Sequence, residues 1–166
     1  GLSIRRLALA DMDAAARVHR ASFDHALPWL VGLHTPDEDR WFYREQMFAA
    51  CTLWGAFDGE TMSGVIAFRD DWIEQLYVLP DAQGRGIGGA LLDRLIEVCK
   101  DLHKWAIHSW IFPENAGSAG LHKSRGFVKV GTYSHMAKMT YGELAGQWRD
   151  TDVYELLLPK PEEKKR

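Results

Sequence analysis

A turn that holds four glycines within a stretch of six residues separates a strand-like segment from the most regular helical pattern of the chain. The preceding residues 76–79 are apolar or aromatic and end at Pro80, which cannot donate a ladder hydrogen bond. In residues 86–102, apolar side chains recur at helical spacing on one wide face, and charged side chains occupy the other. Glycines at a helix N-terminus expose backbone N–H groups, and Arg85 adds a charge, so the turn is typical of a phosphate site.

The turn differs from two common nucleotide-binding motifs. Gly84, Gly86 and Gly89 match the spacing G-x-G-x-x-G by letter, but that fingerprint belongs to a first strand–turn–helix unit with an acid about 20 residues on. Here the turn follows a predicted hairpin at mid-chain, which disfavours a nicotinamide cofactor. A G-x-x-x-x-G-K-[ST] segment is absent from the sequence, which argues against a nucleotide triphosphatase. A purely structural turn remains the alternative.

Composition excludes several classes of function. The chain has 20 Lys and Arg against 23 Asp and Glu, a net charge of −3, and no long basic run, so we expect no nucleic-acid or anionic-membrane partner. No apolar stretch approaches about 18 residues, so no membrane span is expected. Cys51 and Cys99 are interpreted as reduced core residues of a cytoplasmic protein. The histidines lack metal-binding spacing, so we expect no metal site.

The chain length predicts one domain over residues 1–158, followed by a charged, proline-flanked tail at 159–166 that we expect to be disordered. The order of predicted elements indicates an α+β fold with a mixed sheet. Strands are predicted at residues 2–7, 51–57, 62–69, 72–79, 104–112, 127–133 and 152–158, and helices at 11–23, 36–50, 86–102 and 115–125. The connection 134–151 is expected to be a functional or mobile loop.

Two motifs give the chain a family resemblance. Gln83-Gly84-Arg85-Gly86-Ile87-Gly88 matches every fixed position of Gln/Arg-x-x-Gly-x-Gly/Ala after a strand and before a helix. Asn115 and then Leu121-His122-Lys123-Ser124-Arg125-Gly126-Phe127 are similar to an Asn…Phe-Tyr-x-x-x-Gly-Phe pattern. With the order of elements over residues 3–158, these motifs resemble the GNAT superfamily of acyl-CoA-dependent N-acetyltransferases. The resemblance implies a mixed, mostly antiparallel sheet of about seven strands flanked by about four helices.

The resemblance also implies acetyl-CoA as the acetyl donor. In the family, amides of the glycine turn hold the pyrophosphate, and the pantetheine arm lies along the preceding strand like an extra strand. The amide of Val78 is the implied donor to the thioester carbonyl. The implied cofactor-binding residues are Leu76, Tyr77, Val78, Gln83, Gly84, Arg85, Gly86, Ile87, Gly88, Gly89 and Asn115.

Two residues are candidates for proton transfer. Strand alternation would put Glu74 on one face with Leu76 and Val78, where apolar neighbours raise the pKa of a carboxyl and suit a base. A solvated or ion-paired strand carboxylate is the alternative. His122 stands where many family members carry a tyrosine that protonates the leaving thiolate, and a histidine, with its ordinary pKa of about 6.5, can donate a proton. The alternative is a histidine that only packs beside the cofactor.

The resemblance places the acceptor between the segments 23–36 and 134–151. An aromatic lining with few carboxylates would suit a small amine with apolar or aromatic parts. The candidate substrate residues on these segments are Phe23, Trp29, His34, Tyr141 and Trp148.

The sequence thus predicts an N-acetyltransferase that moves the acetyl group of acetyl-CoA to the primary amine of a small molecule by direct attack. Two alternatives stay open: a non-catalytic acyl-CoA-binding sensor module, and acetylation of a protein amine. A homodimer is compatible with the resemblance, and the sequence leaves the oligomeric state open.

Overall fold

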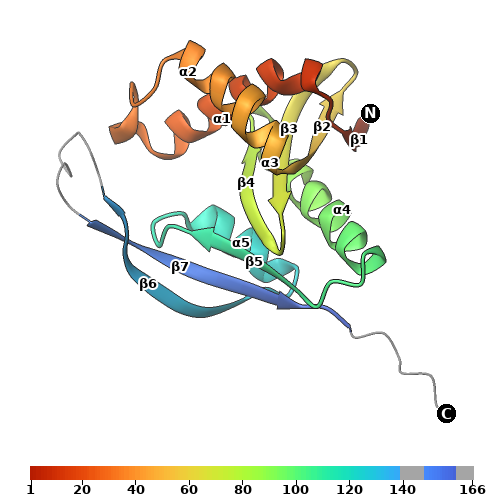
Figure 1. The fold of residues 1–166 in the computed structure, drawn as a ribbon, viewed down its shortest axis with the longest axis vertical. Helices are drawn as coiled ribbons and strands as arrows, with labels where there is room; N and C mark the ends of the chain where they lie inside the picture. Colours follow the sequence, from red (N-terminus) through yellow and green to blue (C-terminus); the bar gives the residue numbers. More distant parts are fainter. Residues whose placement is uncertain (139–147, 160–166) are drawn as a thin grey trace.

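The computed structural model describes residues 1–138 and 148–159 and contains one seven-stranded sheet (Figure 1). The order of the strands across the sheet is β1-β2-β3-β4-β5-β7-β6. The strands are β1 (Leu2–Arg6), β2 (Thr52–Asp58), β3 (Thr61–Arg69), β4 (Trp72–Val78), β5 (Ala106–Ile111), β6 (Val128–Lys138) and β7 (Trp148–Leu157). The predicted α+β fold with a mixed, mostly antiparallel sheet is confirmed.

The pairing of β4 with β5 divides the sheet into two parts. Every other neighbouring pair is antiparallel, whereas β4 and β5 are parallel and pair only at Trp72↔His108 and Ile73↔Ser109. Beyond Ile73 the two strands separate, and Figure 1 shows β4 and the β5–β7–β6 part running in different directions. Among the described residues, the C-terminal half of β4 therefore has no strand partner on one side.

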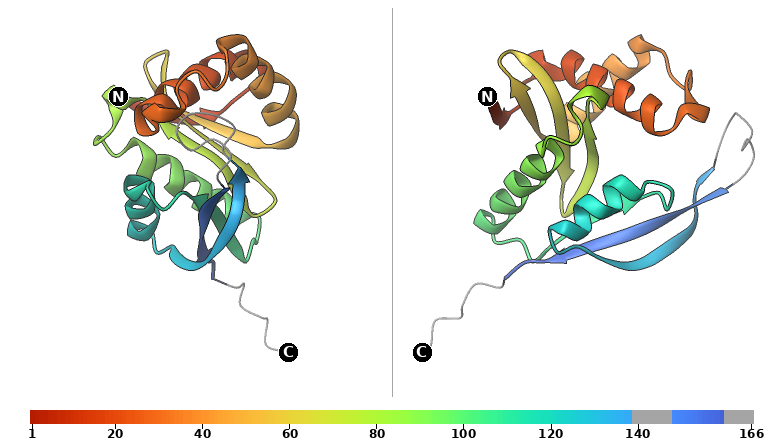
Figure 2. Two further views of the ribbon diagram at one scale, coloured as in Figure 1. Left: turned by 90° about the vertical axis from the view of Figure 1, so that its left-hand side faces the viewer. Right: turned by 180° about the vertical axis from the view of Figure 1, so that it is seen from behind.

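Helices cover both faces of the sheet (Figure 2). One face carries α1 (Met12–Ala26) and a second helical segment made of α2 (Pro36–Trp41), a π-helical turn (Phe42–Met47) and α3 (Phe48–Ala50). The other face carries α4 (Ile87–Asp101), and α5 (Ala116–Ser124) lies beside it. The predicted start of the second segment is confirmed, because the Thr35 hydroxyl accepts from the Glu38 amide and the Glu38 carboxylate accepts from the Thr35 amide, both at 3.2 Å.

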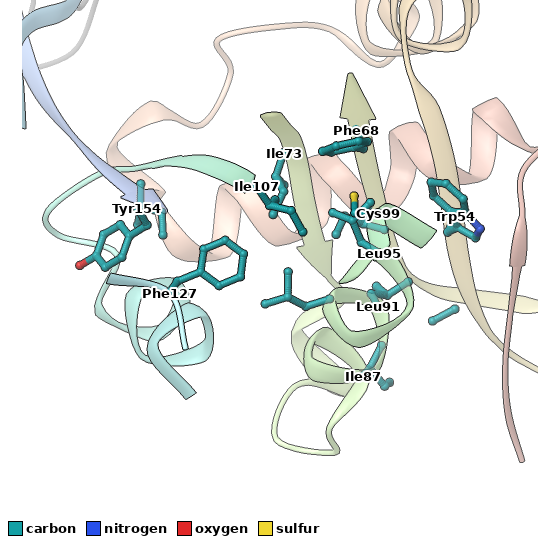
Figure 3. Packing of buried hydrophobic residues seen from close by; sticks show 14 of the residues in the cluster. Trp54, Phe68, Ile73, Ile87, Leu91, Leu95, Cys99, Ile107, Phe127 and Tyr154 are labelled. Carbon is teal, nitrogen blue, oxygen red and sulfur yellow. The ribbon is translucent and has the colours of Figure 1, made fainter. Parts of the chain in front are cut away.

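The larger core lies between α4 and the sheet (Figure 3). Leu91, Leu92, Leu95 and Cys99 are fully buried, which confirms the apolar face predicted for α4. Leu102, predicted on the same face, is instead 61% exposed. The helix ends at Asp101, and the chain turns away in the next residues, so the helical spacing no longer applies at Leu102.

The segment predicted as a long loop at residues 134–151 begins and ends as strand. The strand β6 continues to Lys138 and β7 begins at Trp148, with these two residues paired. Ladder hydrogen bonds join backbone groups and do not require apolar side chains, so an amphipathic pattern does not reveal them. Residues 139–147 and 160–166 lie outside the described part, and so does all of the predicted disordered tail except Pro159. Within the described part, no helix is long and apolar enough to cross a bilayer.

Candidate functional site

Three adjoining cavities run from the glycine turn across the point where β4 and β5 separate. The turn groove, about 670 Å³, follows residues 82–89 and the start of α5. The central cavity, about 220 Å³, shares Leu76, Tyr77 and Asn115 with it. The outer cavity, about 290 Å³, lies against α1 and α2 and shares Phe23 and Gln75 with the central cavity. The shared residues show that the three cavities adjoin, and together they are called the path.

The open edge of β4 forms one wall of this path. The Leu79 amide donates to the Ser63 carbonyl at 2.8 Å. Every second residue of β4, counted back from Leu79, therefore points its backbone N–H and C=O groups toward β3. Antiparallel pairing alternates, so the amides of Leu76 and Val78 point the other way, to the side where β5 has separated. Both residues line the turn groove. The Val78 amide is thus oriented toward the path, as its predicted role requires.

Glycine occurs at these positions of the turn for two different structural reasons. Gly84 and Gly86 have φ of +78° and +80°, in the left-handed region, and Gly86 is the N-cap of α4. A Cβ at Gly88 would lie 2.9 Å from Leu121 Cδ2, and one at Gly89 would overlap the Arg125 guanidinium. The first two glycines therefore shape the turn itself. Gly88 lets α5 approach α4 at Leu121, whereas at Gly89 only the flexible end of Arg125 would have to move.

The predicted cofactor-binding residues gather at the turn groove, with one exception. All of them except Arg85 line it. Asn115 caps α5, because its Oδ1 accepts a hydrogen bond from the Ser118 amide at 3.1 Å. That bond leaves the side-chain NH₂ group of Asn115 for a ligand at the junction of the turn groove and the central cavity.

Strand alternation fails at Glu74. The register of β3 and β4 shifts there, and Ile73 packs in the same core cluster as Leu76 and Val78 although its parity differs from theirs. A β-bulge inserts one residue and moves all later side chains to the opposite face. The prediction that Glu74 shares a face with Leu76 and Val78 by simple alternation is therefore wrong.

Glu74 forms an ion pair on the wall of the central cavity. The Arg69 Nη2 donates to its Oε1 at 2.9 Å, and the two side chains are 51% and 28% exposed respectively. This is the ion-paired alternative that the sequence left open. Glu74 still lines the central cavity beside Gln75, the residue that the central and outer cavities share. Its role as a base stays a prediction.

His122 is buried at the central cavity in a defined protonation state. Its Nδ1 lies 2.7 Å from the Ser118 carbonyl oxygen, which can only accept, so Nδ1 carries the proton. Burial lowers the pKa of His122, so the ring is neutral at pH 7 and Nε2 is unprotonated. This Nε2 is buried without a hydrogen-bond partner among the described residues. His122 thus lines the central cavity as a neutral ring, and its Nε2 must take up a proton before it can donate one.

The outer cavity contains an ion-pair network that the sequence did not reveal. The Arg20 Nε and Nη2 donate to the two oxygens of Asp39, both at 2.8 Å, and Nη1 donates to Asp24 at 3.1 Å. The bidentate bond to Asp39 raises the pKa of Arg20 further above its usual value. Asp39 is only 7% exposed, and it comes from α2, whereas Arg20 and Asp24 lie one turn apart on α1. The i, i+4 pair was visible in the sequence, but its partner on a second helix was not.

His19 lies beside this ion-pair network and packs against aromatic rings. Its Nδ1 is 2.7 Å from the Tyr43 hydroxyl, and its ring centroid is 4.4 Å from that of Tyr77 and 5.9 Å from that of Phe23. Burial, and secondarily the nearby Arg20 charge, lowers the pKa of His19 to about 4. The imidazole therefore presents a neutral, largely apolar surface to the outer cavity at pH 7.

Two of the predicted substrate residues line the outer cavity, and a third lies at the surface. Phe23 and His34 line the outer cavity. Trp29 lines none of the three cavities and is 43% exposed, because the short 3₁₀ turn after α1 carries it to the surface. Tyr141 lies outside the described residues, and so does the side chain of Trp148. In the described part of the chain, no group of three or more His, Cys, Asp and Glu could hold a metal ion.

Comparisons with known proteins show which family and fold this chain resembles. The model of the acetyltransferase (GNAT) family matches residues 14–127. The L-amino acid N-acyltransferase MnaT of Escherichia coli is 28% identical over 95% of this chain and 94% of its own length. An L-methionine sulfoximine/L-methionine sulfone acetyltransferase of Salmonella typhimurium is 32% identical over 67% of this chain and 57% of that protein. The structure of a putative acetyltransferase from Salmonella typhimurium with its cofactor acetyl-CoA has the same fold, with a TM-score of 0.73 and 23% identity over 99% of this chain and 98% of that one.

Proposed function

The chain belongs to the acetyltransferase (GNAT) family, and we propose that it transfers the acetyl group of acetyl-CoA to the primary amine of a small molecule by direct attack. The path of three adjoining cavities carries this proposal. In it, the turn groove binds the coenzyme, the central cavity holds the thioester, and the outer cavity holds the acceptor. A path of this form lets the two substrates meet without a covalent acyl-enzyme.

The residues of the turn groove fit a coenzyme with a pyrophosphate and an amide-bearing arm. The open turn at Gly84 and Gly86 leads into the N-terminus of α4, where free N–H groups and the helix dipole favour an anion. Along β4, the Leu76 and Val78 amides and the Asn115 NH₂ group are available to the carbonyls of the arm. Acetyl-CoA supplies an activated acetyl carbon and a thiolate leaving group.

Glu74 and Val78 prepare the attack. An alkylammonium has a pKa of about 10, so it must lose a proton before its nitrogen can act as a nucleophile. Glu74 takes that proton, directly or through a water. The Val78 amide donates to the carbonyl oxygen as negative charge develops on it. The amine nitrogen forms the new C–N bond with the acetyl carbonyl carbon. The C–S bond of the thioester breaks, and the sulfur leaves with the electron pair.

His122 moves the second proton. Its unprotonated Nε2 accepts the proton that the amine nitrogen loses as the amide forms, and then passes it to the thiolate. Because burial lowers the pKa of His122, the transient imidazolium is a stronger acid than a solvated one. The products are the amide, the free thiol and one proton released to solvent. In this sequence His122 is the acid only after it has acted as an acceptor.

The test measures thiol release from acetyl-CoA in the presence of a panel of small amines, with coenzyme affinity measured separately by calorimetry. Glu74→Gln should lower kcat by about 100-fold and leave the acetyl-CoA Kd unchanged, because it removes the base but not the groove. The matched control is Glu60→Gln, which removes an exposed carboxylate in the β2–β3 turn and should keep the parental kcat. If acetyl-CoA binds and no amine accelerates thiol release, the chain is a non-catalytic acyl-CoA-binding module. If only peptide amines accelerate it, the acceptor is a protein.

A further inference from the structure

The outer cavity carries more negative than positive charge. Its described lining includes one Lys or Arg, Arg20, whose Nε, Nη1 and Nη2 already donate to Asp39 and Asp24. Glu38 adds a further carboxylate to the lining. A hydrogen bond from the Thr35 amide is the main cause that lowers the pKa of Glu38, so it is ionised at pH 7. A cation entering this cavity is attracted, and a second anion is repelled.

Arg20 is poorly placed to bind a carboxylate from a ligand. A guanidinium holds a carboxylate most strongly through the two parallel N–H groups of one edge. In the outer cavity, Asp39 occupies the Nε–Nη2 edge and Asp24 occupies Nη1. These bonds leave one N–H on each terminal nitrogen, but two carboxylates already offset the Arg20 charge, so its attraction for a further anion is weak. Asp39 is 7% exposed and part of the α1–α2 contact.

The rest of the lining is mainly aromatic, and its other residues are Leu33, His34 and Gln75. Phe23, Phe42 and Trp41 line the cavity together with the His19 ring, which is uncharged at pH 7. Faces of aromatic rings attract cations and also pack against apolar groups. The volume of about 290 Å³ is at the lower end for small-molecule sites. The cavity therefore suits a short apolar or aromatic body attached to an ammonium group.

We propose that the outer cavity selects primary monoamines with an aromatic or branched apolar body and no carboxylate. This inference rests on the proposed function, because it takes the outer cavity as the acceptor site. It differs from the activity in the names of two relatives, which act on L-amino acids or on methionine sulfoximine and sulfone. Such a substrate would bring its carboxylate to an Arg20 whose charge Asp39 and Asp24 already offset.

Matched acceptors test the role of the carboxylate alone. Phenethylamine, phenylalanine and phenylalanine amide share one aromatic body, and only phenylalanine carries the negative charge. We expect kcat/KM from thiol release to be at least about tenfold higher for phenethylamine than for phenylalanine, with phenylalanine amide close to phenethylamine. Isopentylamine against leucine repeats the comparison with a branched body. The amines differ in pKa, so measurements at pH 7, 8 and 9 allow their kcat/KM values to be compared at equal fractions of neutral amine.

A charge substitution at the outer cavity tests whether charge causes the expected selectivity. Glu38→Arg should lower the kcat/KM ratio of phenethylamine to phenylalanine by about tenfold, mainly through KM, because it replaces a repelling charge with an attracting one. Glu38→Gln retains the capping box with Thr35 and should lower the ratio less. Asp37→Asn removes a charge from the same helical turn, outside the lining, and should leave the ratio unchanged.

The outcomes separate the two proposals. Phenylalanine turning over as well as or better than phenethylamine overturns the selectivity and leaves the transferase function intact. An unchanged ratio in Glu38→Arg, with the variant folded by its Tm, shows that the outer cavity does not select by charge and also overturns it. Failure of every amine while acetyl-CoA binds overturns the transferase function, and the selectivity falls with it.

Discussion

His19 should make the fold less stable in acid. The folded chain holds this histidine neutral with a pKa of about 4, whereas an unfolded histidine has a pKa of about 6.5. As pH falls below about 6.5, the unfolded chain takes up a proton that the folded chain does not, so the free energy of unfolding falls. The loss begins near the unfolded pKa and is complete below the folded one. Between pH 7 and pH 5 it amounts to about 2 kcal/mol.

The assay is urea unfolding followed by tryptophan fluorescence at pH 7, 6 and 5. His19→Asn does not titrate, and Asn can still hydrogen-bond the Tyr43 hydroxyl, so the variant should lose about 2 kcal/mol less than the parent over this range. His122, whose pKa is also lowered by burial, acts in the same direction in both proteins and cancels in the difference. His103→Asn is the control, because His103 is exposed and its φ of +56° suits Asn. An equal acid loss in His19→Asn and the parent would refute the argument.

Three further substitutions test the turn and the central cavity. Gly86→Ala should cost about 1–2 kcal/mol in urea unfolding, because its φ is +80°, and should weaken acetyl-CoA binding by calorimetry; parental values for both would contradict the role of the turn. Gly89→Ala should change Tm little, because its Cβ would displace only the flexible end of Arg125 and a helix favours Ala over Gly; a large loss of Tm would contradict this. His122→Phe should lower kcat and leave the acetyl-CoA Kd within about twofold, and an unchanged kcat would remove His122 from proton transfer.

The local features of the site were predictable because short-range rules fix them. Only glycine adopts the φ of Gly84 and Gly86 at little cost, and the amphipathic spacing of α4 specifies which of its faces is buried. Asn115 at the start of a short helix is a common N-cap, and the structure has it in that position. The glycine turn and the helix that follows it could thus be identified from the order of residue types along the chain, whereas the coenzyme-binding roles were implied only by the family resemblance.

The functional chemistry of the other cavities depends on contacts between distant segments. The bulge at Glu74 arises from how β4 pairs with β3, and the path opens because β4 and β5 pair at only two positions. The protonation state of His122 follows from burial and from the direction of one carbonyl.

Arg20 and Asp39 are far apart in the sequence, and their pairing gives the outer cavity its charge balance. Backbone preferences and helical spacing act between neighbours in the chain, so the sequence shows them directly. Strand register, desolvation and ion pairing depend on which segments meet when the chain packs, and only the folded chain fixes that.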